Sequence, residues 1–126
     1  MNLWLVFAAL NGALAVMAGA YAAHGGREWL SPEALGWFEK AVRYQMAHAL
    51  ALIAVVILGT RAVVGWSQAL TVSAWAFCAG LVLFCGGLYV MAFTGNAAVG
   101  RVAPLGGMSF MIGWLALAWH GLRAAP

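Results

Sequence analysis

The chain has 126 residues, of which 66% are hydrophobic and only 7% are charged, and its formal net charge is +3. Soluble domains carry about 25% charged residues, so this composition excludes a soluble fold. The small and dispersed positive charge also gives no reason to expect nucleic acid as a partner. A chain of this length forms a single domain, residues 1–126, and we expect it to be an all-α integral membrane protein.

Four long apolar stretches predict four transmembrane helices. A helix needs about 20 mostly apolar residues to cross a hydrocarbon core about 30 Å thick. The first stretch is too long for a signal peptide, and no basic residue precedes it. The expected spans, which form a four-helix bundle, cover residues 3–23, 41–59, 69–93 and 105–122.

A short amphipathic helix is expected between the first two spans, at residues 32–42. Ser31 is a suitable N-cap and Pro32 fits the first helical position. Glu39 and Arg43 have the spacing of an ion pair on a helix surface. We expect one helix that lies first along the membrane surface, enters the membrane near Arg43 and continues to about Gly59, with room for a bend between the two parts. The apolar run from Met46 to Gly59 is too short to cross alone.

Small residues recur at helical spacing on three spans and predict close helix packing. Such stripes favour a structural or interaction protein that self-associates as a homo-oligomer or docks on a membrane complex. The residues are Ala8, Gly12, Ala15 and Gly19 in the first span, Gly80 and Gly87 in the third, and Gly106 and Gly113 in the fourth.

Polar residues gather on the side of the membrane shared by the end of the first and third spans and the start of the second and fourth. An ionisable residue inside a span is costly and therefore suggests a functional site. An alternative is that His48 bonds a neighbouring helix while His24 caps the first span. Asn11, in mid-span, is expected to make an interhelical hydrogen bond. The candidate ligand-binding residues are His24, Arg43, Tyr44, Gln45, His48, Tyr89 and Thr94.

The sequence offers little for catalysis or for metal binding. It contains no aspartate, and its three glutamates, at positions 28, 33 and 39, all fall in the segment between the first two spans. No Ser–His–acid arrangement or metal-ligand spacing occurs within a span. Haem would need two imidazoles facing across a dry cavity, whereas His24 is expected to lie near water. We therefore expect no enzyme activity, catalytic residue, metal or cofactor, and we expect membrane lipids as partners.

An even number of spans places both termini on the same side of the membrane. Four of the six basic residues lie on the opposite side, so the positive-inside rule favours termini outside the cytoplasm.

Four segments resemble a known family of small membrane proteins, domain of unknown function 423, also called the transmembrane protein 256 family. They are AHGG after the first span, VRYQMAHALAL entering the second, GGLYVMAFTG closing the third and PLGGMSFMIGWLALAW in the fourth. The resemblance implies a four-span protein of bacterial inner membranes and no established activity. Ala22 and Ala47 depart from the glycine and the aromatic residue that the family pattern leads us to expect.

Two functions thus remain open. We favour the structural or interaction protein. The alternative is binding or transport of a lipid headgroup, a quinone-like molecule, an ion or a proton at the polar side, where Arg43 would attract an anion such as a lipid phosphate.

Overall fold

The computed structural model describes residues 1–63 and 65–124. Within that part of the chain, four helical segments are long and apolar enough to cross a membrane, and they cover Leu3–Ala23, Pro32–Arg61, Gln68–Thr94 and Val99–Arg123. The predicted all-α bundle is confirmed. The elements are α1 (Leu3–Ala23), α2 (Gly26–Trp29), α3 (Pro32–Arg61), α4 (Gln68–Gly80), the π-helical turn η1 (Leu81–Cys85), α5 (Gly86–Thr94), the 3-10 turn η2 (Val99–Val102) and α6 (Ala103–Arg123).

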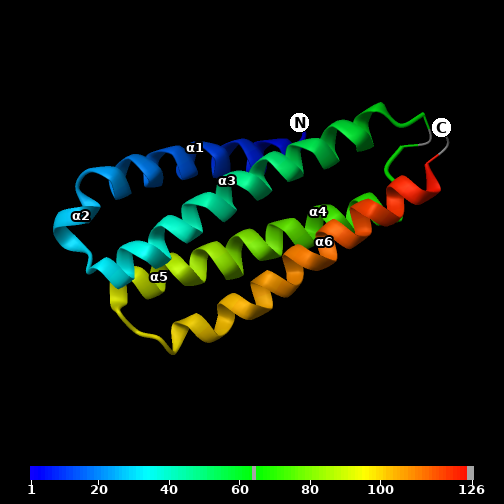
Figure 1. Cartoon of the computed structure of the whole chain (residues 1–126). Coiled ribbons are helices and arrows are strands. Elements are labelled where there is room, and N and C mark those ends of the chain that lie inside the picture. Colours follow the sequence, from blue (N-terminus) through cyan, green and yellow to red (C-terminus); the bar gives the residue numbers. More distant parts are fainter. Residues whose placement is uncertain (64, 125–126) are drawn as a thin grey trace.

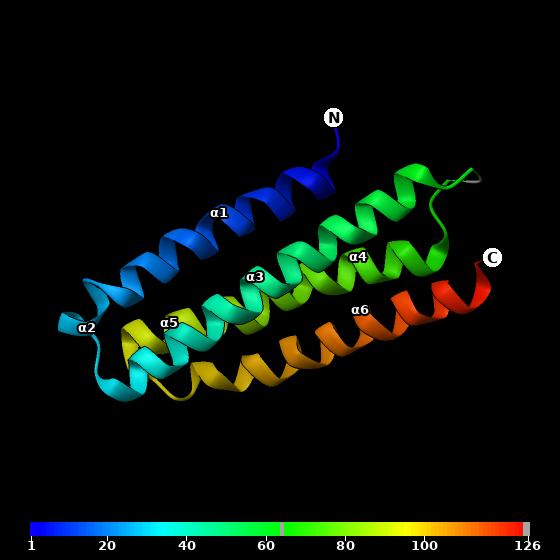
Figure 2. The same cartoon turned by 45° about the horizontal axis from the view of Figure 1, so that its top comes forward.

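The spans lie side by side as long rods, with the C-terminus at one end and α2 at the other (Figure 1). The shorter α1 starts on the C-terminal side, and the N-terminus lies short of that end. The most extensive interfaces join α1 to α3 and α4 to α6, so the bundle consists of two hairpins. Helix α3 also packs against α4, η1 and α5. Figure 2 shows α1 as the outermost helix, separated from α6 by α3 and the third span.

The segment 32–42 differs from the expected surface helix, because it forms the first turns of the straight helix α3 (Figure 1). The physical reason is an unbroken buried stripe. Ala34, Phe38, Ala41 and Gln45 are all buried and are separated by steps of four, three and four residues. These steps repeat one face of an α-helix, so the stripe that packs the span extends back to the helix start.

Between α4 and α6, a phenylalanine ring of each helix packs directly on a glycine of the other, where there is no side chain to block it. A Cβ atom added to Gly113 would lie 2.6 Å from the Phe77 ring. One added to Gly80 would lie 2.8 Å from Cγ of Phe110. Each helix thus supplies a ring to the glycine of the other. Such close approach of backbones is the usual means by which helices associate in lipid.

The π-helical turn η1 brings the backbone of the third span against α6. A Cβ atom on Gly106 would lie 2.7 Å from Cα of Phe84 and closer still to its backbone nitrogen. A single π-helical turn is a rare interruption of an α-helix and is often found near functional sites. Only a glycine fits at position 106, because its neighbour is main chain and cannot rotate away.

Hydroxyl groups add hydrogen bonds to the same interface. Ser73 Oγ, which is fully buried, donates to the Gly113 carbonyl at 2.9 Å. Ser109 Oγ donates to the Ala76 carbonyl at 2.7 Å. Because a carbonyl oxygen has two lone pairs, these bonds need not disrupt the helix that provides the acceptor. They satisfy the hydroxyl groups within the apolar interior.

Alanines rather than glycines make the main contact between α1 and α3. A Cβ atom on Gly12 would meet nothing within 4 Å, and one on Gly19 would lie 3.4 Å from Cγ1 of Val42, an ordinary contact. Of the four predicted packing positions of α1, Ala8 and Ala15 are buried, while Gly12 faces open space. The buried residues of α1, spaced by seven, are Ala8, Ala15 and Ala22.

Candidate functional site

The polar turn of α3 that begins at Arg43 faces three separate hollows. Successive residues of an α-helix point about 100° apart. Accordingly, Arg43, Tyr44 and Gln45 each line a different hollow on the surface of the bundle. The single polar patch expected from sequence is thus divided around the circumference of α3.

Two of the predicted ligand-binding residues lie at helix ends, away from these hollows. His24 is exposed and occupies the C-cap of α1, where its backbone N–H donates to the Ala20 and Tyr21 carbonyls at 3.2 Å each. Thr94 is the last residue of α5, and its Oγ1 donates to the Val90 carbonyl at 2.7 Å. The structure does not bring either side chain into contact with the other candidates.

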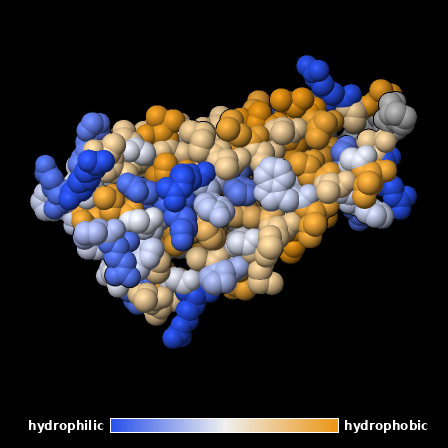
Figure 3. Space-filling model, in the orientation of Figure 1, coloured by the Kyte–Doolittle hydropathy of each residue, from blue (hydrophilic) through white to orange (hydrophobic). Residues whose placement is uncertain are grey.

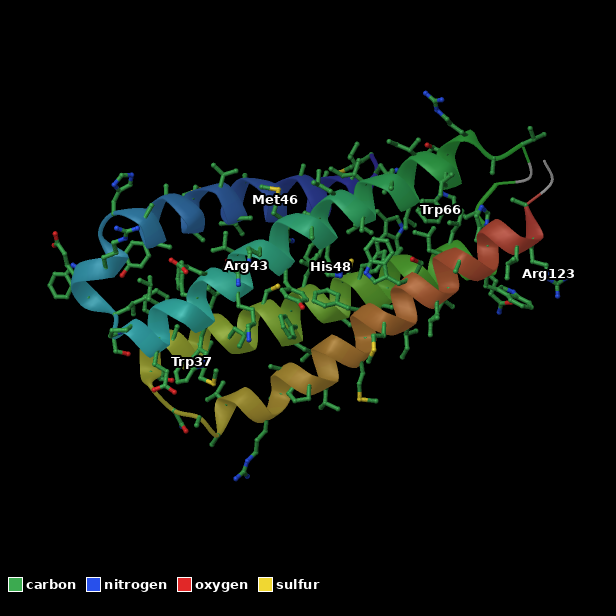
Figure 4. The ribbon with its side chains drawn as sticks, viewed as in Figure 1. Trp37, Arg43, Met46, His48, Trp66 and Arg123 are labelled. Carbon is green, nitrogen blue, oxygen red and sulfur yellow. The ribbon has the colours of Figure 1, made fainter. Side chains whose placement is uncertain are left out.

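His48 lies in the interior, between α3 and the α4–α6 pair (Figure 4). Its side chain is 5% exposed. Nδ1 donates to the Tyr44 carbonyl at 2.8 Å, and Nε2 accepts from Nε1 of Trp114 at 3.1 Å. A carbonyl can only accept and an indole can only donate, so the imidazole is neutral and carries its proton on Nδ1. Both nitrogens are occupied, which leaves none for a ligand.

Aromatic rings surround His48. Its ring stacks on Phe110 with centroids 3.6 Å apart and meets Phe77 edge-on at 5.6 Å. The adjacent hollow, between α3 and α6, has a volume of about 400 Å³ and is also lined by Tyr44 and Phe84. Rings at these separations contribute packing energy beyond the area they bury. The geometry assigns His48 to this packed cluster.

A chain of three polar side chains joins α1, α3 and α5 inside the membrane-spanning region. The Tyr89 hydroxyl donates to Gln45 Oε1 at 2.7 Å, and Gln45 Nε2 donates to Asn11 Oδ1 at 3.1 Å. Asn11 Nδ2 in turn donates to the Phe7 carbonyl at 3.0 Å. The interhelical hydrogen bond expected of Asn11 is therefore confirmed. Because Asn11 donates to the Phe7 carbonyl, its side-chain oxygen faces Gln45. This series of hydrogen bonds therefore fixes which end of the Gln45 amide is nitrogen and which is oxygen.

The hollow that Gln45 and Tyr89 line lies between α1, α3 and α5 and has a volume of about 520 Å³. This volume falls within the range typical of small-molecule sites, about 300–1,000 Å³. Its aromatic wall is a cluster in which Phe38 contacts Tyr21 at 5.4 Å, Tyr89 at 4.9 Å and Phe93 at 5.6 Å between ring centroids. Among the lining side chains, Gln45 alone carries an amide, and it is 6% exposed.

Metal binding has little support in the part of the chain that the structure describes. There, no group of three or more His, Cys, Asp or Glu side chains is close enough to hold a metal ion. Cys78 and Cys85 are free thiols on the third span. The hollows beside α3 present hydrogen-bonding groups, aromatic rings and the charges of arginine and glutamate.

Comparison with known proteins shows which family these features belong to. The family model described as "Protein of unknown function (DUF423)" matches residues 18–107. The chain belongs to this family. The matched residues include the whole polar turn of α3 and Tyr89, whereas Asn11 and Trp114 lie outside them.

Curated relatives of the family are named membrane proteins. The chain is 40% identical to a UPF0382 membrane protein of Staphylococcus aureus, over 93% of both chains. It is 36% identical to one of Haemophilus influenzae, over 98% of this chain and 96% of the relative. It is 35% identical to the UPF0382 membrane protein YwdK of Bacillus subtilis, over 91% and 92% of the two chains. No solved structure matches the chain. With its four apolar helices, this family member is a membrane protein.

Proposed function

We propose that the protein binds a lipid-soluble molecule with a carbonyl or hydroxyl group in the hollow between α1, α3 and α5. The observation that carries this proposal is the Gln45 amide in the lining of a hollow whose other lining residues are apolar or aromatic. A polar group loses hydrogen bonds when it enters hydrocarbon. A dissolved molecule with one such group would regain a partner at this amide.

The fixed orientation of the amide defines the ligand chemistry. Gln45 Nε2 carries two N–H groups, of which one donates to Asn11. The second can donate to a ligand carbonyl. The oxygen of Tyr89, which uses its proton on Gln45, retains lone pairs that can accept from a ligand hydroxyl. A quinone-like ring between the aromatic side chains, with its tail toward Leu14 and Met17, fits this arrangement.

Removing the Tyr89 hydroxyl is expected to weaken binding of a decyl-substituted benzoquinone about fivefold, since one hydrogen bond contributes about 1 kcal/mol. Tyr89→Phe keeps the ring and its contact with Phe38. Gln45→Leu, which removes both amide groups, should weaken binding at least as much. The measurement is calorimetric titration of the quinone into the protein in nanodiscs.

Tyr44→Phe is the matched control for this experiment. Tyr44 is on the same helix, one position before Gln45, but it lines the hollow between α3 and α6. Its variant should bind the quinone as the unaltered protein does. Equal weakening by Tyr44→Phe and Tyr89→Phe would contradict the proposal, as would affinity that neither Tyr89→Phe nor Gln45→Leu changes.

Assembly through α1 is a second candidate function, favoured by one observation. Gly12 has free space around its Cα, and α1 is the outermost helix. Gly80 of α4 and Gly106 and Gly113 of α6, by contrast, are already covered by phenylalanines of the same chain. A second copy or a partner helix could therefore approach closely at α1.

If α1 mediates self-association, Gly12→Leu should reduce the particle mass in mild detergent to that of one chain. Leucine in place of glycine blocks close approach of two backbones. Gly36→Leu is the control, because Gly36 lies on a helix, has equally open surroundings and is remote from α1's mid-span. Light-scattering masses that stay the same in both variants would exclude this interface.

A further inference from the structure

The third hollow beside α3 lies at the corner where α1, α2 and α3 meet. Its volume is about 220 Å³. Three of its lining residues are charged, namely Arg27 from α2 and Glu39 and Arg43 from α3. Its apolar side is made of small or short side chains, including Gly19, Ala22 and Val42. None of these residues lines the hollow that contains Gln45.

The charges at this corner favour an anion. Two guanidinium groups and one carboxylate give the lining a net charge of +1. Guanidinium groups bind phosphate oxygens through paired, charge-assisted hydrogen bonds. One phosphodiester would neutralise the site.

The depth of Arg43 indicates where that phosphate would lie. Arg43 and Thr60 are 17 residues apart on α3, which is about 26 Å at 1.5 Å per residue. The hydrocarbon core is about 30 Å thick. With the last turn of α3 at one boundary, the Cα of Arg43 falls just inside the other, and its side chain can reach the headgroups. Figure 3 shows hydrophilic side chains extending from the α2 end into the apolar band.

We propose that the hollow lined by Arg27, Glu39 and Arg43 binds the phosphate of an anionic phospholipid. Arg27 approaches from the connection outside the spans and Arg43 from within α3, so that the headgroup lies between them. The alanine and glycine surface of α1 beside the arginines leaves room for the start of an acyl chain. This site is independent of the quinone-binding proposal because it shares no residue with it.

The test uses native mass spectra of the full chain, purified in mild detergent and mixed with dioleoylphosphatidylglycerol. Arg27→Gln and Arg43→Gln should each lower the affinity for the lipid about tenfold, through loss of a charge-assisted contact. Glu39→Gln should raise it, because the variant removes the negative charge from the lining. Arg61→Gln is the control, since Arg61 is exposed at the far end of α3.

Each other outcome has a definite meaning. Equal loss in Arg61→Gln would show general attraction to basic residues and overturn the site. Equal retention of dioleoylphosphatidylcholine would overturn its preference for an anionic headgroup. Displacement of the lipid by inorganic phosphate would reassign the site to free phosphate. Thermal melting of each variant verifies folding, and if Arg43→Gln does not fold, the result for Arg27→Gln decides.

Discussion

Replacing Gly106 by alanine is expected to lower the free energy of unfolding by about 3 kcal/mol, at the upper end of the usual cost of overpacking. The added methyl group would collide with the backbone of Phe84, at 2.7 Å from its Cα. A side chain could rotate away, but here α6 must move from the third span. Unfolding in mixed micelles with increasing denaturing detergent measures the loss.

Gly107→Ala provides the control at the next position. A Cβ atom on Gly107 would lie 3.7 Å from the Phe84 ring, an ordinary contact. Alanine also favours a helix over glycine by about 1 kcal/mol, so this variant should be as stable as the unaltered protein or slightly more so. Equal destabilisation of both variants would refute the close approach at Gly106.

Truncating His48 to alanine is the second change with a large expected effect, a loss of about 3 kcal/mol of stability. The ring is 5% exposed and stacks on Phe110 at 3.6 Å, so its removal leaves a cavity among aromatic side chains. It also leaves the Trp114 indole without its acceptor. The same detergent unfolding assay measures this change.

Two comparisons separate packing from hydrogen bonding at this position. His48→Phe keeps a ring of similar size and should lose only about 1 kcal/mol, the net value of the hydrogen bonds. His24→Ala, at an exposed helix end, should change stability by no more than about 0.5 kcal/mol. If His48→Phe were as unstable as His48→Ala, hydrogen bonding rather than packing would hold this part of the bundle.

Hydropathy alone predicts the spans well because lipid imposes their length. The third span was expected at residues 69–93 and is observed at Gln68–Thr94. The capping residues correctly predict that the second helix begins at Pro32, but hydropathy marks where a helix leaves lipid, so its first turns were expected along the membrane surface. Residues 32–42 continue the helix, since their buried stripe packs on neighbouring elements.

The grouping of the candidate site could be predicted only in part. The sequence expectation grouped Arg43, Gln45 and His48 on one side of the membrane, whereas His48 lies near the middle of the bundle, halfway along α3 (Figure 4). The sequence does not reveal how α3 is rotated about its axis, since apolar residues occur all around the helix. Rotation decides that Gln45 meets Asn11 while His48 meets Trp114. The π-helical turn beside Gly106 likewise has no sequence signal that we can identify.

The pairing of the spans as two hairpins has a consequence for biosynthesis. Each hairpin joins consecutive spans, so its interface becomes available as soon as its own second helix leaves the ribosome. The first half can therefore pair α1 with α3, including the bond from Gln45 to Asn11, before the rest of the chain exists. The side-chain oxygen of Gln45, Oε1, has no such early partner. It acquires one only when α5 arrives with Tyr89, so the two halves are joined by a polar contact completed late in translation.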